Sequence, residues 1–151
     1  MIFWILFFLT FIGMEFAAWA LHKYVMHGFL WCWHQDHHVV TGKTFQKNDR
    51  FALFFAIPSF LLILIGHIQN VMWLYGVGFG IMAYGIAYFM VHEVIIHRRL
   101  TFLRGRGFYF LALIRAHLDH HKVQTKEGCF NFGMLIVPWR YFVWAFKRRF
   151  L

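Results

Sequence analysis

Three apolar runs, each long enough to cross a lipid bilayer, constrain this chain more than any other feature. They occupy residues 2–21, 51–69 and 71–91 of the 151-residue sequence. A bilayer core needs a helix of about 20 apolar residues, and within it only helices and closed barrels satisfy the backbone. Because 61% of the residues are hydrophobic and only 14% are charged, we expect an all-α integral membrane protein with three transmembrane helices. The last two runs nearly touch, which predicts a tight hairpin.

The basic residues lie on one side of these runs. Every Lys or Arg outside the segment between the first two runs lies at or after Arg98, and those within that segment are Lys23, Lys43, Lys47 and Arg50. Basic residues in short loops favour the cytoplasmic side. We therefore expect the N-terminus outside and residues 22–50 and 92–151 on the cytosolic side. No basic residue precedes the first run, which favours a retained span over a cleavable signal peptide.

The C-terminal residues 134–151 are apolar but interrupted by Pro138 and Arg140, and they end in a basic stretch of Lys147, Arg148 and Arg149. This pattern predicts an amphipathic tail at the membrane interface, with a fourth span as the alternative. Residues 1–151 are expected to form a single membrane domain, in which a helical cap covers the cytosolic ends of the spans.

Ten of the eleven histidines fall into four boxes with the order HxxxxH, HxxHH, HxxxxH and HxxHH. Neutral imidazole is the commonest metal ligand near neutral pH, and ten rings exceed the coordination shell of one ion. The pattern predicts two metal ions at the cytosolic side, held by residues 22–38 and 92–121. The ten candidates are His22, His27, His34, His37, His38, His92, His97, His117, His120 and His121.

The spacing within the boxes supports a metal site. Residues i, i+3 and i+4 share one face of an α-helix, so each HxxHH triplet can aim three rings at one point. An i, i+5 pair is about 140° apart on an ideal helix, so each HxxxxH must straddle a helix end or a widened turn. A cluster without function is the competing interpretation, and two paired boxes in the same order argue against it.

Four carboxylates are candidates for orienting the histidines from outside, as carboxylates often do: Glu15, Asp36, Glu93 and Asp119. For the last three, ion pairing with nearby Lys or Arg is the alternative. Glu15 lies inside the first span, where an ionisable residue costs about 2.5–3.5 kcal/mol, and on roughly the same helix face as His22. It either orients a histidine, faces a polar cavity, or is a protonated acid bonded to a neighbouring helix.

Other features carry less weight. His67 lies near the far end of the second run and is excluded from the site. Cys32 and Cys129 lack the CxxC spacing of a metal motif. Gly76 and Gly80 form a GxxxG pattern inside a span, which favours close helix packing over a nucleotide loop.

Four segments of the chain resemble the bacterial-type beta-carotene 3-hydroxylases, a branch of the fatty acid hydroxylase superfamily of histidine-box membrane di-iron enzymes. The resemblance extends from about Glu15 to Pro138 and includes the stretches between the boxes. The segments are HKYVMHGFLWCWHQDHH (22–38), FQKNDRFALFFA (45–56), YGIAYFMVHEVIIHRR (84–99) and RAHLDHHKVQTKEGCFNFG (115–133).

The resemblance implies that the ten boxed histidines hold two non-haem iron ions and that no catalytic residue beyond these ligands is needed. It implies O2-dependent hydroxylation of both beta-ionone rings of beta-carotene at position 3, giving cryptoxanthin and then zeaxanthin. The substrate would come from the bilayer of a bacterial inner membrane, and no nucleic acid is expected as a partner. Aromatic residues such as Trp19, Tyr84, Tyr88 and Phe89 could line its path; the alternative for each is that it faces lipid or packs between helices.

Each turnover of such a reaction needs two electrons, and the sequence has no recognisable flavin, nicotinamide or iron–sulfur motif. We therefore expect an external donor, a ferredoxin with its reductase, attracted by the formal net charge of +9. Contact with anionic lipid headgroups explains the charge equally well. Two alternative functions stay open: hydroxylation of a sterol, sphingolipid or fatty acyl chain, and non-catalytic metal binding or transport.

Overall fold

The computed structural model describes residues 1–39 and 45–148, and these residues contain helices and connecting segments. Lys43 and Arg149, two of the basic residues used above, lie outside the described residues. The elements in chain order are α1 (Ile2–Ala20), the π-helical η1 (Leu21–Phe29), α2 (Trp31–His38), the 3-10 turn η2 (Lys47–Ala52), α3 (Leu53–Gln69), α4 (Met72–Phe89), the π-helical η3 (Met90–Ile96), α5 (Phe108–His121) and α6 (Trp139–Arg148).

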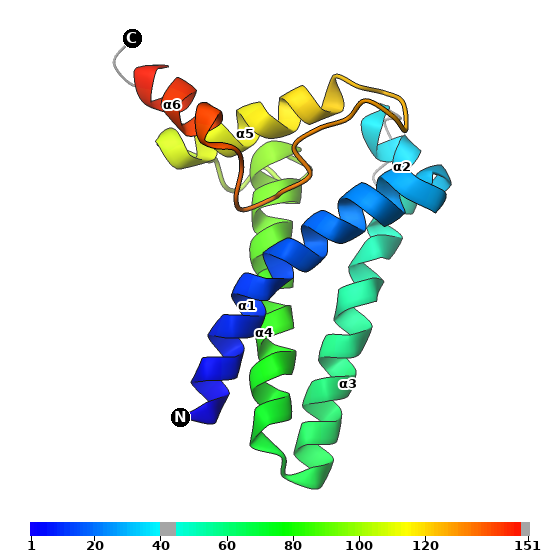
Figure 1. Cartoon of the computed structure of the whole chain (residues 1–151), viewed down its shortest axis with the longest axis vertical. Helices are drawn as coiled ribbons and strands as arrows, with labels where there is room; N and C mark the ends of the chain where they lie inside the picture. The colour runs from blue at the N-terminus through cyan, green and yellow to red at the C-terminus, as the bar shows by residue number, and fades with distance from the viewer. Residues whose placement is uncertain (40–44, 149–151) are drawn as a thin grey trace.

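Three long helices form the membrane part of the molecule, and shorter helices cover one end of it (Figure 1). The segments apolar and long enough to cross a bilayer are Ile2–Phe29, Lys47–Gln69 and Met72–Ile96. They match the three predicted spans, the third starting one residue later than expected, so the three spans are confirmed. The first and third are longer than expected because a π-helical turn continues each one toward the cap.

The predicted hairpin between the second and third spans is confirmed. Asn70 ends α3 in the left-handed conformation, with φ 55° and ψ 39°, and the Val71 N–H bonds back to the Gly66 carbonyl at 2.9 Å. Such a left-handed residue satisfies the last carbonyls of a helix and reverses the chain. Deeper in the hairpin, the Ser59 hydroxyl donates to the Gly78 carbonyl at 2.8 Å, so α3 and α4 are also held together by a polar contact.

The cap is built from α5 and α6, which pack against each other beyond the ends of the spans. Their shared core contains Ala112, Leu113 and Ala116 of α5 with Tyr141 and Ala145 of α6. Since α6 has 10 residues, about half of what a span requires, the part of the tail that the structure describes forms no fourth span. Its last turn carries Lys147 and Arg148, in agreement with the predicted amphipathic tail.

Glycines allow α1 and α4 to approach closely, as the GxxxG pattern predicts. A Cβ atom built on Gly76 would lie 2.7 Å from the Phe3 carbonyl oxygen, and one on Gly80 would lie 2.8 Å from the Phe7 carbonyl oxygen. Both obstacles are backbone atoms of α1, which cannot rotate away. The short distance between the two helices therefore depends on the absence of a side chain at Gly76 and Gly80.

We expect Gly80→Ala to push α1 away from α4 and to lower stability by about 1–3 kcal/mol, the usual cost of overpacking. Unfolding of the purified protein in detergent by increasing SDS measures this change. Gly85→Ala in the same helix is the matched control, since nothing lies within 4 Å of its added Cβ; it should be neutral or stabilising, because Ala favours a helix over Gly by about 1 kcal/mol. Equal destabilisation by both variants would contradict this account.

Candidate metal centre

The ten boxed histidines converge at the junction between the spans and the cap. Nine of them form two groups in which one ring nitrogen from each residue lies within 4.8 Å of those from the others. The first group contains His22, His27, His34, His38 and His120, and the second contains His37, His92, His97 and His117. The members come from η1, α2, the end of η3 and α5, so four separate segments of the chain meet here.

The two HxxxxH boxes lie on the two π-helical turns, which confirms the predicted widened turns. In η3 the His97 N–H bonds to the His92 carbonyl at 2.9 Å, an i to i+5 hydrogen bond. Widening the turn in this way brings residues five apart onto one face. The ring centroids are consequently close, 4.6 Å apart for His92 and His97 and 5.2 Å apart for His22 and His27.

The expectation that each HxxHH triplet aims three rings at one point is wrong. On α2, His34 and His38 belong to the first group and His37 to the second. At about 100° per residue the second and third histidines of a triplet diverge by about 100°. The rings of one triplet therefore spread widely enough to reach two adjacent groups. The triplet on α5 is divided in the same way, with His120 in the first group and His117 in the second.

His121 lies between the two groups. Its ring centroid is 4.5 Å from that of His38 in the first group and 4.4 Å from that of His117 in the second. Its Nε2 atom is buried and has no hydrogen-bond partner among the described residues. A buried nitrogen without a partner is costly, and a metal ion in either group would give it one.

Each ring of the first group is oriented by an oxygen atom that accepts a hydrogen bond from its Nδ1 atom. Four of these acceptors are backbone carbonyls of the segment after α5, and the fifth is a side-chain amide oxygen at only 2.6 Å. Since an oxygen of this kind only accepts, the hydrogen lies on Nδ1 and the Nε2 lone pair points inward. The pairs are His22 with Phe132 (3.1 Å), His27 with Lys126 (3.2 Å), His38 with Val123 (2.9 Å), His120 with Phe130 (2.8 Å) and His34 with Asn48.

The inward nitrogens lie close together although none of them carries a hydrogen. Nε2 of His34 lies 3.1 Å from that of His22 and 3.2 Å from that of His38. Burial lowers the pKa of His38 to about 4 and that of His120 to about 3, so the rings are neutral near pH 7 and no proton bridges them. Converging lone pairs repel unless a cation lies between them, and the donor set therefore fits a metal ion that prefers imidazole.

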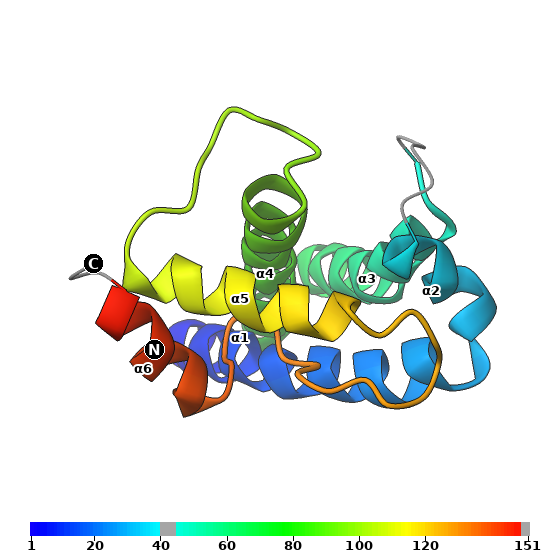
Figure 2. The same ribbon diagram turned by 90° about the horizontal axis from the view of Figure 1, so that it is seen from above.

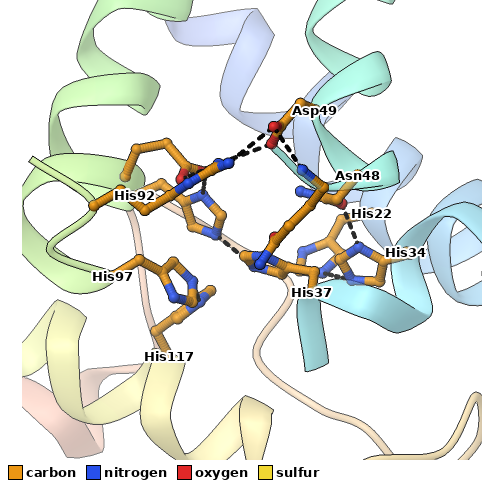
Figure 3. A network of polar contacts seen from close by, with 11 residues as sticks. His22, His34, His37, Asn48, Asp49, His92, His97 and His117 are labelled. Carbon is orange, nitrogen blue, oxygen red and sulfur yellow. Dashed lines mark hydrogen bonds and ion pairs between the residues drawn. The ribbon is translucent and has the colours of Figure 1, made fainter. Parts of the chain in front are cut away.

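Two rings of the second group, those of His37 and His92, are oriented by side chains (Figure 3). Nδ1 of His37 donates to the Gln46 side-chain oxygen at 3.0 Å, and Nδ1 of His92 donates to Glu93 at 2.6 Å. Glu93 is held in turn by Arg99 at 2.7 Å. The inward Nε2 atoms of His37 and His92 lie 3.0 Å apart, as close as those of the first group.

Of the four carboxylates singled out from the sequence, Glu93 contacts a boxed histidine in the structure. Asp119 forms ion pairs with Lys122 at 2.7 Å and Arg115 at 3.3 Å. Asp36 accepts hydrogen bonds from the backbone N–H groups of residues 47 and 48, at 2.7 and 3.4 Å. It thereby fixes the turn that carries Asn48, whose side chain orients His34.

The non-helical segment that follows α5 lies beside α1 (Figure 2), and Glu15 of α1 anchors it. Its carboxylate accepts hydrogen bonds from the N–H groups of Met134, Leu135 and Ile136, at 2.9–3.1 Å, and from the Tyr84 hydroxyl at 2.7 Å. Irregular backbone at membrane depth persists only where its polar groups find partners within the protein. Glu15 therefore holds the segment whose Phe132 carbonyl accepts the hydrogen bond from His22.

Several residues of the site were not found from the sequence. Gln46, Asn48 and Asp49 lie between the second box and the second span, and Arg99 follows the third box. One pattern could have drawn attention to them: Gln46 and Asp49 form a capping box at the start of η2. His67, which the sequence analysis left out of the site, belongs to neither group, and its ring contacts the Tyr75 hydroxyl at 3.0 Å.

Comparisons with known proteins agree with the geometry. The family model described as Fatty acid hydroxylase matches residues 7–143. A beta-carotene hydroxylase of Pantoea ananas is 46% identical over 134 residues, which cover 87% of this chain and 75% of that protein. The beta-carotene hydroxylase of Paracoccus sp. (strain PC1) is 35% identical over 133 residues, covering 85% and 80%. A chloroplastic beta-carotene 3-hydroxylase of Gentiana lutea is 35% identical, with 84% and 40% covered. No solved structure gives a significant match.

Acid should destabilise the metal-free protein. Burial lowers the pKa of His38 to about 4 and that of His97 to about 3, below the ordinary value of 6.5. Below pH 6.5 the unfolded chain therefore binds more protons than the folded one, and stability is lost as the pH falls from 6.5 toward 4. Thermal unfolding of chelator-treated protein between pH 8 and pH 5 measures this loss. His67→Ala should not change the profile, and a melting temperature independent of pH would contradict the prediction.

We expect Glu15→Gln to loosen the segment after Phe132, because an amide offers one acceptor oxygen in place of two and an N–H group that repels the backbone donors. Faster hydrogen exchange at the amides of residues 134–136 measures this. Tyr84→Phe removes a donor but keeps the backbone hydrogen bonds, so it should leave these amides protected. Unchanged exchange in Glu15→Gln would show that the carboxylate does not hold the segment.

Proposed function

Because the chain belongs to the fatty acid hydroxylase family, we propose that it is a beta-carotene hydroxylase with a histidine-ligated pair of iron ions. It would insert one oxygen atom of O2 at position 3 of each beta-ionone ring, giving cryptoxanthin and then zeaxanthin. The observation that carries the proposal is the match to beta-carotene hydroxylases over most of the chain. That match spans all four segments that bring histidines to the site.

The proposed ligands are the ten boxed histidines, five in the first group, four in the second and His121 between them. Bound iron would supply the activation of O2 that an unreactive ring C–H bond requires. The chain itself contributes the geometry, since each outward Nδ1–H bond fixes the direction in which a ring presents its Nε2 atom. The chain also excludes water from the site, since the exposed fraction of His34 is 1% and that of His120 is 0%.

The substrate would approach from the bilayer, where a carotenoid is already dissolved. Of the aromatic residues expected along its path, Tyr88 lies nearest the metal groups, with its ring 5.1 Å from that of His92. Trp19 lines a groove of about 420 Å³ between α1 and the segment after α5. Phe132 lines the same groove. Its ring centroid is 5.4 Å from that of His22 and 5.4 Å from that of His120, so this groove adjoins the first group.

We place the site at the cytosolic face of a bacterial inner membrane, following the distribution of basic residues. A ferredoxin with its reductase would deliver the two electrons of each turnover, and the net charge of +9 would favour an acidic donor. The spans, cap and tail would act as one domain. Leu135 supports this, because it packs against both the core shared by α1 and α4 and the core shared by α5 and α6.

Expression in cells that accumulate beta-carotene tests the proposal, with pigment analysis as the measurement. The wild-type chain should produce cryptoxanthin and zeaxanthin. His38→Ala and His92→Ala, one from each group, should abolish both products, while His67→Ala should retain them. Unaltered beta-carotene in the presence of a folded, iron-loaded wild-type chain would refute the proposed substrate. An altered sterol or acyl lipid in the same cells would identify the alternative one.

A further inference from the structure

A carboxylate network joins the third box to the start of the second span. Glu93 accepts a hydrogen bond from Nδ1 of His92 with one oxygen, at 2.6 Å, and from Arg99 with the other, at 2.7 Å. The Arg99 guanidinium also donates to both oxygens of Asp49, at 2.8 and 2.9 Å. The ring of His92 is thus tied to the opposite side of the site through two acids and one arginine.

The network returns to the second histidine group through α2. Asp49 accepts a hydrogen bond from the Gln46 N–H at 3.0 Å, and the Gln46 side-chain oxygen accepts one from Nδ1 of His37 at 3.0 Å. Nε2 of His37 then faces Nε2 of His92 at 3.0 Å. These contacts form a closed ring, in which two histidines of the second group are linked both across the site and around its outside (Figure 3).

The first group is held differently. The acceptors for its five Nδ1 atoms are neutral, four backbone carbonyls and the Asn48 amide. A hydrogen bond to a carboxylate is charge-assisted and stronger than one to a neutral oxygen. It also pulls the Nδ1 proton away from the ring and raises the basicity of Nε2. Among the oriented rings that the structure describes, His92 has this advantage and the rings of the first group do not.

We propose that Glu93 is a positioning residue whose hydrogen-bonded ring with Arg99, Asp49 and Gln46 selectively strengthens metal binding by the second group. The proposal rests on the proposed function, because it takes the two groups to hold one iron ion each. The consequence is that the two ions are chemically distinct. The ion of the second group is bound by a more basic imidazole whose direction is fixed from two sides, and the ion of the first group depends on the backbone after α5.

The test uses the full-length chain in detergent, loaded anaerobically with ferrous iron and then challenged with a chelator. Two iron ions per wild-type chain should be lost in two phases. Glu93→Gln removes the charge and turns an N–H group toward Arg99, so one phase should become about 10- to 100-fold faster, the usual effect of losing a partner behind a ligand. The other phase should not change. Mössbauer spectra of 57Fe-loaded protein should show a shift in one of two iron signals.

Asp119→Asn is the matched control, since Asp119 is also an ion-paired carboxylate close to the boxes but bonds to Lys122 and Arg115. It should leave both phases unchanged. Asp49→Asn tests the ring from its other side and should accelerate the same phase as Glu93→Gln. In the double variant the two effects should be less than multiplicative, because each breaks the same ring.

Several results would overturn the inference. Equal acceleration of both phases by Glu93→Gln and by Asp49→Asn would show that the ring does not act selectively on the second group. Wild-type kinetics in both ring variants would show that the ring does not strengthen either group. A wild-type chain that binds no iron would instead refute the proposed function, and the inference would fall with its premise.

Discussion

The structure depends on buried imidazoles, seven of them held from behind by an oxygen atom, so that their Nε2 atoms face one another. Burial lowers the pKa of His34, His38 and His120, so these rings are uncharged near neutral pH, and the oxygen atoms behind them fix which nitrogen carries the hydrogen. Nitrogens that carry no hydrogen then approach to 3.1 Å across the first group and 3.0 Å across the second. Repulsion among these lone pairs is the cost of an arrangement suited to bind cations, and the fold must offset that cost elsewhere.

The remainder of the fold supplies the rigidity. The glycines of α4 allow α1 to pack closely against it, and this packing fixes η1 relative to η3 at the cap end of the spans. Glu15 then holds the segment after α5 against α1, and the carbonyls of that segment orient rings on η1, α2 and α5. Placing an ionisable residue inside a span costs free energy. Here that cost is offset by hydrogen bonds to three backbone N–H groups that would otherwise lie unpaired at membrane depth. The membrane anchor and the metal centre are therefore parts of one hydrogen-bonded structure.

Local patterns predicted much of this architecture, because they act over a few residues. Apolar runs predicted the spans, Gly76 and Gly80 predicted close helix packing, and the i, i+5 spacing of histidines predicted widened turns. Such patterns could not predict contacts between residues that are distant in the sequence. Glu15 bonds to residues about 120 positions away, and four rings bond to backbone carbonyls, which every residue possesses and no sequence letter marks. The division of the HxxHH triplets likewise depends on where the second group lies.

The two groups differ in what can change them. A backbone carbonyl cannot be removed by substitution, so four rings of the first group depend on the position of the segment after α5, which Glu15 holds through hydrogen bonds to Met134, Leu135 and Ile136. In the second group, His37 and His92 are oriented by the side chains of Gln46 and Glu93, which substitution can change directly. The chain thus combines a group oriented mainly by backbone carbonyls with a group in which two rings are oriented by polar side chains. Because α2 and α5 each contribute histidines to both groups and cannot move for one group alone, separate adjustment of the two groups depends on this kind of difference.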